Sequence, residues 1–435
     1  MNKNISRFYT LLVLIGVVSM TSCKKDFGNL NNPTVEDFLK NAGKDQLNNL
    51  VSGTESAMRN NLGLYLDDVS VIGREIYRFS GADPRYTTDL LGASDAQLNN
   101  TGFYIVNTWS AKYRVVKNCN LLIQAANNST FITENEKKAY IGFAKTVKAY
   151  QLLLVLNLTG SNGVKIDVDD PAHPAPTVGS DESLTAIAAL LDEAKADLGG
   201  AEVSFPLSSG FRSFNDAAGL IKFNRAIAAR VSVYRQKWDE ALTNLSESFF
   251  DLQGPFELGV YHVFGTGSGD QLNSAFSLQN QAGEVRLAHP DFGTGLDADD
   301  DRQDKATERN SPYTNTDLTS DKDVWVYTSS TAPVPIIRNE ELILIYAEAK
   351  IQGGVFPDAV TALNTIRTTH NAPVYAGAVN KEALITEMLN QRRYSLYFEG
   401  HRWVDLRRYD LLTSLPVDRP EDDVWTAFPL PSTEE

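Results

Sequence analysis

Apolar positions along this chain recur mostly at three- and four-residue intervals, the spacing of amphipathic α-helices. In residues 133–160, Thr133 and Glu136 have the spacing of a capping box, and an apolar stripe follows them. A second segment of this kind begins at Asp181 and ends at Gly199–Gly200. The pattern therefore predicts a mainly α-helical fold.

Two further helical segments are interrupted near their middle. Residues 222–245 break around Gln236–Trp238, and residues 338–371 break across Gly353–Pro357. Each interrupted segment resembles a tetratricopeptide unit, in which two helices pack as a helix–turn–helix. We expect such helix pairs to form the body of the fold.

Two stretches carry little helical periodicity. Residues 164–179 are rich in Pro and Asp, and residues 251–330 are rich in Gly, Asp, Asn and Thr. Strand-like patterns are few, and residues 255–264 and 323–330 could be short hairpin arms. Long irregular segments inside a compact domain are more often functional than linking. We interpret both stretches as large loop insertions.

The first residues have the layout of a secretory signal. Lys3 and Arg7 give a positive start, and residues 8–20 form an uncharged, mostly apolar run. Such a run reaches about 20 Å as a helix, short of the ~30 Å hydrocarbon core, so a permanent transmembrane helix is a poor interpretation. The small residues before Cys23 resemble a bacterial lipobox, in which the cysteine becomes acylated. An ordinary cleaved signal with an incidental cysteine is the alternative.

We therefore assign residues 1–22 to a lipoprotein signal peptide, residues 23–34 to a polar tether and residues 35–435 to one domain. With Cys23 acylated, Cys119 has no cysteine partner, so we expect no disulfide. Cys119 should then serve as a small buried hydrophobe.

The charge and motif content exclude several classes of function. The formal net charge of −15 repels phosphate backbones, so nucleic-acid binding is not expected. The five histidines show no ligand spacing, and neither a nucleotide-binding fingerprint nor a nucleophile elbow occurs. We expect no catalytic residues and no cofactor.

One acidic segment partly matches an EF-hand calcium loop. Arg302 stands at its sixth place, where the tight turn demands glycine. A solvated acidic loop is therefore the preferred interpretation, with calcium binding as the alternative. The acidic residues at the ligand places are Asp297, Asp299, Asp301 and Glu308.

Two helical segments carry charges at spacings that bring them onto common faces. In residues 394–410 the charges at intervals of three alternate in sign, so the array neutralises itself. This arrangement favours an internal network between helices over a catalytic centre. We expect Glu341 and Glu348 to face Arg392, Arg402 or Arg408. The proposed network comprises Arg338, Glu341, Glu348, Arg392, Glu399, Arg402, Asp405 and Arg408.

These two segments resemble the signatures of a known family. Residues 338–350 and 391–410 are similar to the two signatures of the SusD/RagB family of nutrient-binding outer-membrane lipoproteins. The chain departs from the usual pattern at Glu340, Gln391 and Ser395. These departures thin the charge network but leave its main members in place.

The resemblance implies a SusD-like scaffold of tetratricopeptide-like helix pairs, with a ligand surface built from loops. It also implies a lipid-anchored protein of the outer membrane, facing the cell exterior, that delivers a nutrient oligomer such as a glycan to a SusC-like TonB-dependent transporter. A lipid-anchored scaffold that binds only protein is the alternative. A hydrolase is disfavoured because no nucleophile or isolated acid pair occurs.

Aromatic side chains in polar, irregular segments are the candidates for stacking on sugar rings. Aromatics on helices recur at core spacing and are expected to be buried. Trp325 is the first choice because indole offers the largest stacking face and a hydrogen-bond donor. Packing within loops is the alternative for each candidate. The four candidates are Tyr86, Tyr313, Trp325 and Tyr327.

Overall fold

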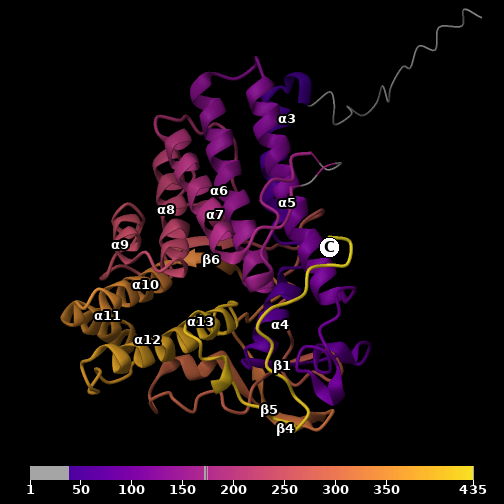
Figure 1. Ribbon diagram of the computed structural model, residues 1–435, viewed down its shortest axis with the longest axis vertical. Coiled ribbons are helices and arrows are strands. Elements are labelled where there is room, and N and C mark those ends of the chain that lie inside the picture. Colours follow the sequence, from indigo (N-terminus) through magenta and orange to yellow (C-terminus); the bar gives the residue numbers. More distant parts are fainter. Residues whose placement is uncertain (1–38, 171–172, 174, 435) are drawn as a thin grey trace, which may run out of the picture.

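The computed structural model describes residues 39–170, 173 and 175–434, and within them the fold is mainly helical (Figure 1). Four long helices, α5 to α8, stand side by side, and α10 to α13 form a second group beside them. The helices are α3 (Lys44–Ala57), α4 (Leu62–Ile72), α5 (Phe103–Asn128), α6 (Glu134–Thr159), α7 (Ser180–Leu198), α8 (Ala217–Tyr234), α9 (Trp238–Ser246), α10 (Asn339–Gln352), α11 (Phe356–Thr369), α12 (Lys381–Ser395) and α13 (Arg402–Arg408).

The helix boundaries follow the sequence signals. The capping box before α6 is present: Thr133 Oγ1 accepts from the Glu136 N–H at 3.2 Å, and the Thr133 N–H donates to Glu136 Oε2 at 2.8 Å. Gly199 follows α7, as expected. The chain between α8 and α9 turns at Gln236, whose φ is 56°. These elements confirm the predicted helical fold.

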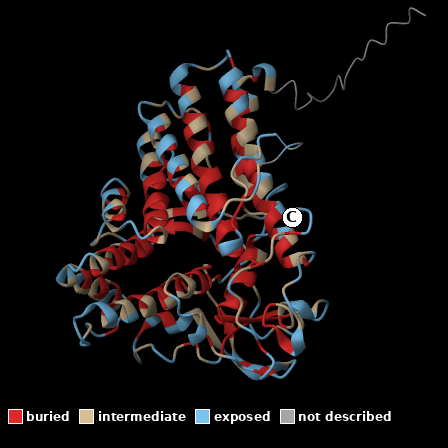
Figure 2. Cartoon of the chain, in the orientation of Figure 1, coloured by how far each residue is buried: buried red, intermediate tan, exposed pale blue. Residues whose placement is uncertain are grey.

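The predicted helix pairs are also present. Helix α8 packs on α9, and α10 packs on α11. Helix α10 is buried almost throughout, including its three glutamates (Figure 2). Its residues Leu342 and Ile345 belong to the main core, whereas Ile343 and Leu344 belong to a second core with α11 and α12. Helix α10 therefore joins the two helical groups.

Residues 251–330 are helix-poor, as predicted, but they are less irregular than expected. They contain four strands, and most of the antiparallel sheet with order β1-β3-β5-β4 comes from them. Strand β4 was not predicted from the sequence because it is largely exposed and polar. It lacks the alternation of apolar and polar residues that marks a half-buried strand. The strands are β1 (Ile76–Phe79), β2 (Gly259–His262), β3 (Val285–Ala288), β4 (Ala306–Asn315), β5 (Leu318–Val324) and β6 (Val334–Arg338).

The expected hairpin arms do not pair with each other. Residues 255–264 do contain β2, but its partner is β6, which leads directly into α10. Residues 323–330 leave β5 after Val324 and continue as irregular chain. In the other predicted insertion, the described part of residues 164–179 holds a single bridge between Val164 and Val178.

The C-terminal residues form a strap that we define as residues 416–432. The strap runs back along the N-terminal half of the molecule (yellow in Figure 1). The Arg74 guanidinium donates to the carbonyl oxygens of Pro416 and Asp423, at 3.2 and 2.6 Å. Further along, the Phe428 N–H donates to the Leu158 carbonyl at 3.0 Å. The strap therefore fastens α4 and α6 to the end of the chain.

Cys119 is fully buried, as expected, and burial raises the pKa of its thiol to about 12. The predicted signal peptide, the tether with Cys23 and the start of the domain at residue 35 lie outside the described residues. Among the helices that the structure describes, none is both long enough and apolar enough to cross a membrane.

Candidate functional site

The charged signature residues form ion pairs inside the protein. Glu348 on α10 accepts from Arg408 at 2.8 Å, which confirms the expected contact between the two signature segments. Arg408 also pairs with Asp405 at 2.8 Å, and Asp405 accepts from Arg392 Nε at 2.6 Å. Burial opposes ionisation, but Arg392 and Arg408 outweigh it and lower the pKa of Asp405 to about 2. Asp405 therefore stays charged at neutral pH.

Arg338 joins a second group of charges. It lies at the end of β6, donates to the Ser395 carbonyl at 2.7 Å, and pairs with Glu399 at 2.7 Å and with Glu340. Glu340, which departs from the family pattern, is held on its other side by His370 Nε2 at 2.8 Å. The departure therefore extends the charge network instead of thinning it.

Two expected contacts were wrong. Glu341 pairs with Arg230 of α8, and its closest approach to the second signature is His401, at 4.0 Å. Arg402 has only Asp291 as an acidic neighbour within ion-pair distance, at 3.9 Å, among the described residues. Burial, reinforced by Arg393, lowers the pKa of Arg402 to about 10.

The second signature is not one continuous helix. Helix α12 ends at Ser395 and α13 begins at Arg402. Phe398 and Gly400 between them have φ values of 59° and 84°, and an L side chain rarely adopts this left-handed region. The expected row of Glu399, Arg402, Asp405 and Arg408 on one helix therefore breaks, because Glu399 lies in the turn.

The acidic residues of the partial EF-hand match do not converge. Asp297 pairs with Arg367 at 2.8 Å, and Asp301 pairs with His370 at 2.6 Å. Glu308 lies on β4 and pairs with Lys322 at 3.4 Å. Within the described residues, Asp297, Asp299, Asp301 and Glu308 form no cluster that could hold a metal ion. The calcium alternative was wrong.

The four candidate aromatics differ in exposure. Tyr327 is only 5% exposed, its ring packs against Phe398, and its hydroxyl donates to the Phe398 carbonyl at 3.3 Å. The proposal that Tyr327 stacks on a ligand was therefore wrong. Tyr313 and Trp325 are half-buried; Tyr313 stacks on Phe79, and Trp325 lies near Phe276.

Tyr86 is half-buried and lines a groove that we name the α4–α5 groove. The groove has a volume of about 630 Å³ and lies between α4, the first half of α5, and residues 271–274. The Arg78 guanidinium lies 4.9 Å from the centre of the Tyr86 ring, and burial raises the pKa of Tyr86 to about 12. Of the four candidates, Tyr86 is the one that the structure places in an open groove.

Helix α5 gives the groove a polar wall. Asn107, Ser110, Ala111 and Arg114 follow one another at helical spacing, so they share one face. In the described part of the chain, the Asn107 amide, the Ser110 hydroxyl and the Arg114 guanidinium make no hydrogen bond. These exposed donors and acceptors are open to a ligand. Sequence reasoning missed this wall, although the three polar residues at helical spacing could have been recognised in the sequence.

The floor of the groove is built from buried charges. Asp67 on α4 accepts two hydrogen bonds from Arg286 of β3, at 2.6 and 2.8 Å. Arg78 of β1 approaches the same carboxylate at 3.5 Å. Because Asp67 and Arg286 are nearly inaccessible to solvent, the pair holds its geometry without a ligand.

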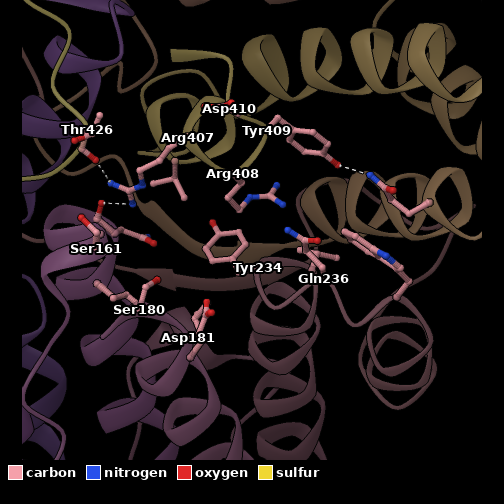
Figure 3. Close-up of a pocket in the computed structure, with 18 of the residues that line it drawn as sticks. Ser161, Ser180, Asp181, Tyr234, Gln236, Arg407, Arg408, Tyr409, Asp410 and Thr426 are labelled. Atoms are coloured by element: carbon pink, nitrogen blue, oxygen red, sulfur yellow. Dashed lines mark hydrogen bonds between the residues drawn. The ribbon is translucent and has the colours of Figure 1, made fainter. Parts of the chain in front are cut away.

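A larger hollow of about 820 Å³ lies between α13 and the ends of α6 and α8 (Figure 3). Its arginines are occupied: Arg407 donates to the carbonyls of Asn157 and Thr426, at 2.8 and 3.2 Å, and stacks on Trp403. Arg408 is committed to Glu348 and Asp405. We interpret this hollow as a seam between the helical groups, and the α4–α5 groove as the candidate ligand site.

Comparison with solved structures identifies the fold. The fold is a mainly helical SusD-like fold with a few short strands. A SusD superfamily protein from Bacteroides vulgatus matches with a TM-score of 0.70 at 16% identity, over 90% of this chain and 96% of that chain. Surface glycan-binding protein A from Bacteroides thetaiotaomicron matches with a TM-score of 0.70 at 13% identity, over 91% and 97%. The same protein in complex with laminarihexaose also gives a TM-score of 0.70 at 13% identity, over 90% and 97%.

A sequence match supports the family resemblance for the C-terminal part of the chain. Residues 280–428 match the SusD family, and this range contains both signature segments. No curated protein matches the chain significantly.

Proposed function

We propose that this protein captures a glycan in the α4–α5 groove at the cell surface and delivers it to a SusC-like TonB-dependent transporter. The observation that carries the proposal is the row of exposed polar side chains on α5, in a groove that Tyr86 also lines, in a SusD-like fold. Sugar hydroxyls are matched by amides, hydroxyls and guanidinium groups, while C–H faces of sugar rings suit an aromatic side chain.

The buried ion pairs of the two signature segments support a ligand site in the groove and not in the signatures. Its arginines and carboxylates are mutually neutralised between helices, so they hold the scaffold together and leave ligand contacts to the groove. The match to a surface glycan-binding protein and to its laminarihexaose complex supports a glycan as the ligand class. A lipid on Cys23 would keep this domain at the outer membrane, close to its transporter.

Calorimetry with a panel of oligosaccharides tests the proposal. For the glycan that binds, Tyr86→Ala and Asn107→Ala should each weaken affinity about ten- to a hundredfold, ~1.4–2.8 kcal/mol. Phe131→Ala is the matched control, because Phe131 is 64% exposed on the connection between α5 and α6. Unchanged affinity in both groove variants would show that the α4–α5 groove is not the glycan site.

The transporter partnership needs a separate experiment. The tagged lipoprotein should co-purify with a TonB-dependent transporter from detergent-solubilised outer membranes of its native host. Recovery of other proteins without such a transporter would favour the interaction scaffold that the sequence left as the alternative.

A further inference from the structure

We infer that the glycan taken by the α4–α5 groove is acidic, carrying carboxylate or sulfate groups; this inference rests on the proposed function. The charge of the groove is opposite to that of the chain, which has 40 Lys and Arg against 55 Asp and Glu. Four arginines line the groove with one acidic residue, Asp67. The four are Arg59, Arg78, Arg114 and Arg286.

Three of the arginines already have acidic partners. Arg286 pairs with Asp67. Arg78 lies between Asp67, at 3.5 Å, and Glu284, at 2.6 Å. Arg59 pairs with Asp270 at 2.8 Å and also donates to the Val263 carbonyl. Three carboxylates therefore face four guanidinium groups.

Arg114 is the uncompensated charge. It is exposed on α5, and among the described residues it has no ion pair and no hydrogen bond. Helix α5 contains no Asp or Glu along its whole length, so no neighbour on the same helix can neutralise Arg114. Its planar fork of N–H donors matches a carboxylate or sulfate group in a bidentate geometry.

The polar side chains beside Arg114 favour binding of an acidic sugar over binding of a simple anion. Asn107 and Ser110 precede Arg114 on the same face of the helix, so ring hydroxyls and an acidic group can be bound together. The buried walls of a groove also focus the field of its unpaired cation, which strengthens attraction for negative ligands. In a protein of net charge −15, such a local cation can recruit acidic ligands that the remaining surface repels.

Pairs of oligosaccharides that differ only in charge test this inference. We would compare hexagalacturonate with its methyl ester, and a chondroitin sulfate hexasaccharide with its desulfated and carboxyl-esterified form. In at least one pair, the acidic member should bind about tenfold or more tightly than its neutral counterpart. This preference should fall as NaCl rises from ~50 to ~500 mM, because salt screens an exposed cation.

The variant Arg114→Gln should remove most of the preference, because it weakens binding of the acidic member far more than binding of the neutral member. Lys138→Gln is the control, because Lys138 is also an exposed cation without an ion pair in the described residues but lies near the start of α6. Equal or tighter binding of the neutral member, or an intact preference in Arg114→Gln, overturns the inference. If a neutral glycan binds and Tyr86→Ala abolishes that binding, the proposed function stands and only the acidic ligand class fails. If no member of any pair binds, the inference of an acidic ligand fails, and the oligosaccharide panel with the Tyr86 and Asn107 variants decides the proposed function separately.

Discussion

The Arg230 guanidinium and the Glu341 carboxylate form a bidentate ion pair, with Nε–Oε1 and Nη2–Oε2 distances of 2.6 Å. Arg230 is 4% exposed and Glu341 is 2% exposed. Burial disfavours the charged carboxylate, but Arg230 outweighs it and lowers the pKa of Glu341 to about 2. Arg230 also donates to the Ile336 carbonyl at 2.7 Å, so the pair connects α8 with both β6 and α10.

The first prediction follows from this pair. Glu341→Gln should lower the free energy of unfolding by ~3–5 kcal/mol, because the buried Arg230 charge loses its counter-ion. Urea unfolding measures the change. Glu193→Gln is the control, since Glu193 is 60% exposed and pairs with Lys145 at the surface, where a pair contributes ~0–1 kcal/mol. A similar small loss in both variants would contradict the structural role of the Arg230–Glu341 pair.

The second prediction concerns the pH dependence of stability. Burial raises the pKa of Glu75 to about 7, although Arg402 partly opposes the shift. The folded state then binds the Glu75 proton more tightly than the unfolded state, so stability falls as pH rises from the ordinary value of 4.5 through about 7.

Glu75→Gln should remove this loss. Relative to the parent protein, the variant should gain stability as pH rises from about 4 to about 8, by ~3 kcal/mol at most. Thermal unfolding at a series of pH values would measure the difference. A stability difference that stays constant over this range would mean that Glu75 does not titrate there.

The third prediction distinguishes a structural role for Tyr327 from a ligand-binding role for Trp325. Tyr327→Ala should lower stability by ~3–5 kcal/mol, because it leaves a cavity beside Phe398, with affinity per folded molecule unchanged. Trp325→Ala should lose less stability, because Trp325 is half-buried. If Trp325 stacks on the glycan, Trp325→Ala should also weaken glycan binding about ten- to a hundredfold in the same titrations. Unchanged affinity in Trp325→Ala would restrict the site to the α4–α5 groove.

The fourth prediction concerns Cys23. Cys23→Ser should move the protein from the membrane fraction to the soluble fraction, since each buried CH₂ of a lipid anchor contributes ~0.8 kcal/mol to membrane binding. Circular dichroism should show unchanged helix content. Mass spectrometry of the parent protein should find the acylated cysteine at its N-terminus. Membrane retention of the variant with an uncleaved N-terminus would disprove lipid anchoring.

Local signals in the sequence were reliable guides to local structure. The capping box at Thr133 and Glu136 and the break at Gln236 depend on residues a few positions apart, so they could be recognised without the fold. The Glu348–Arg408 contact was predictable because both residues lie in recognisable signatures.

Contacts between distant segments could not be derived in this way. Arg230 and Glu341 are 111 residues apart, and no spacing rule connects them. Strand β4 carries polar side chains and owes its conformation to hydrogen bonds with β5. The α4–α5 groove combines residues near positions 60, 110 and 271, so only the assembled fold brings its walls together.

The strap of residues 416–432 has a consequence for how the chain folds. Its Arg419 guanidinium donates to the Thr87 carbonyl at 2.9 Å, and the Trp425 indole donates to the Asp89 carbonyl at 3.0 Å. Thr87 and Asp89 are synthesised early, but their hydrogen-bond donors lie more than 300 positions later in the chain. Contacts of such long sequence separation slow folding and leave partly folded chains open to aggregation. The backbone carbonyls of Thr87 and Asp89 therefore gain these hydrogen-bond donors only after the last part of the chain has been made and the strap has docked.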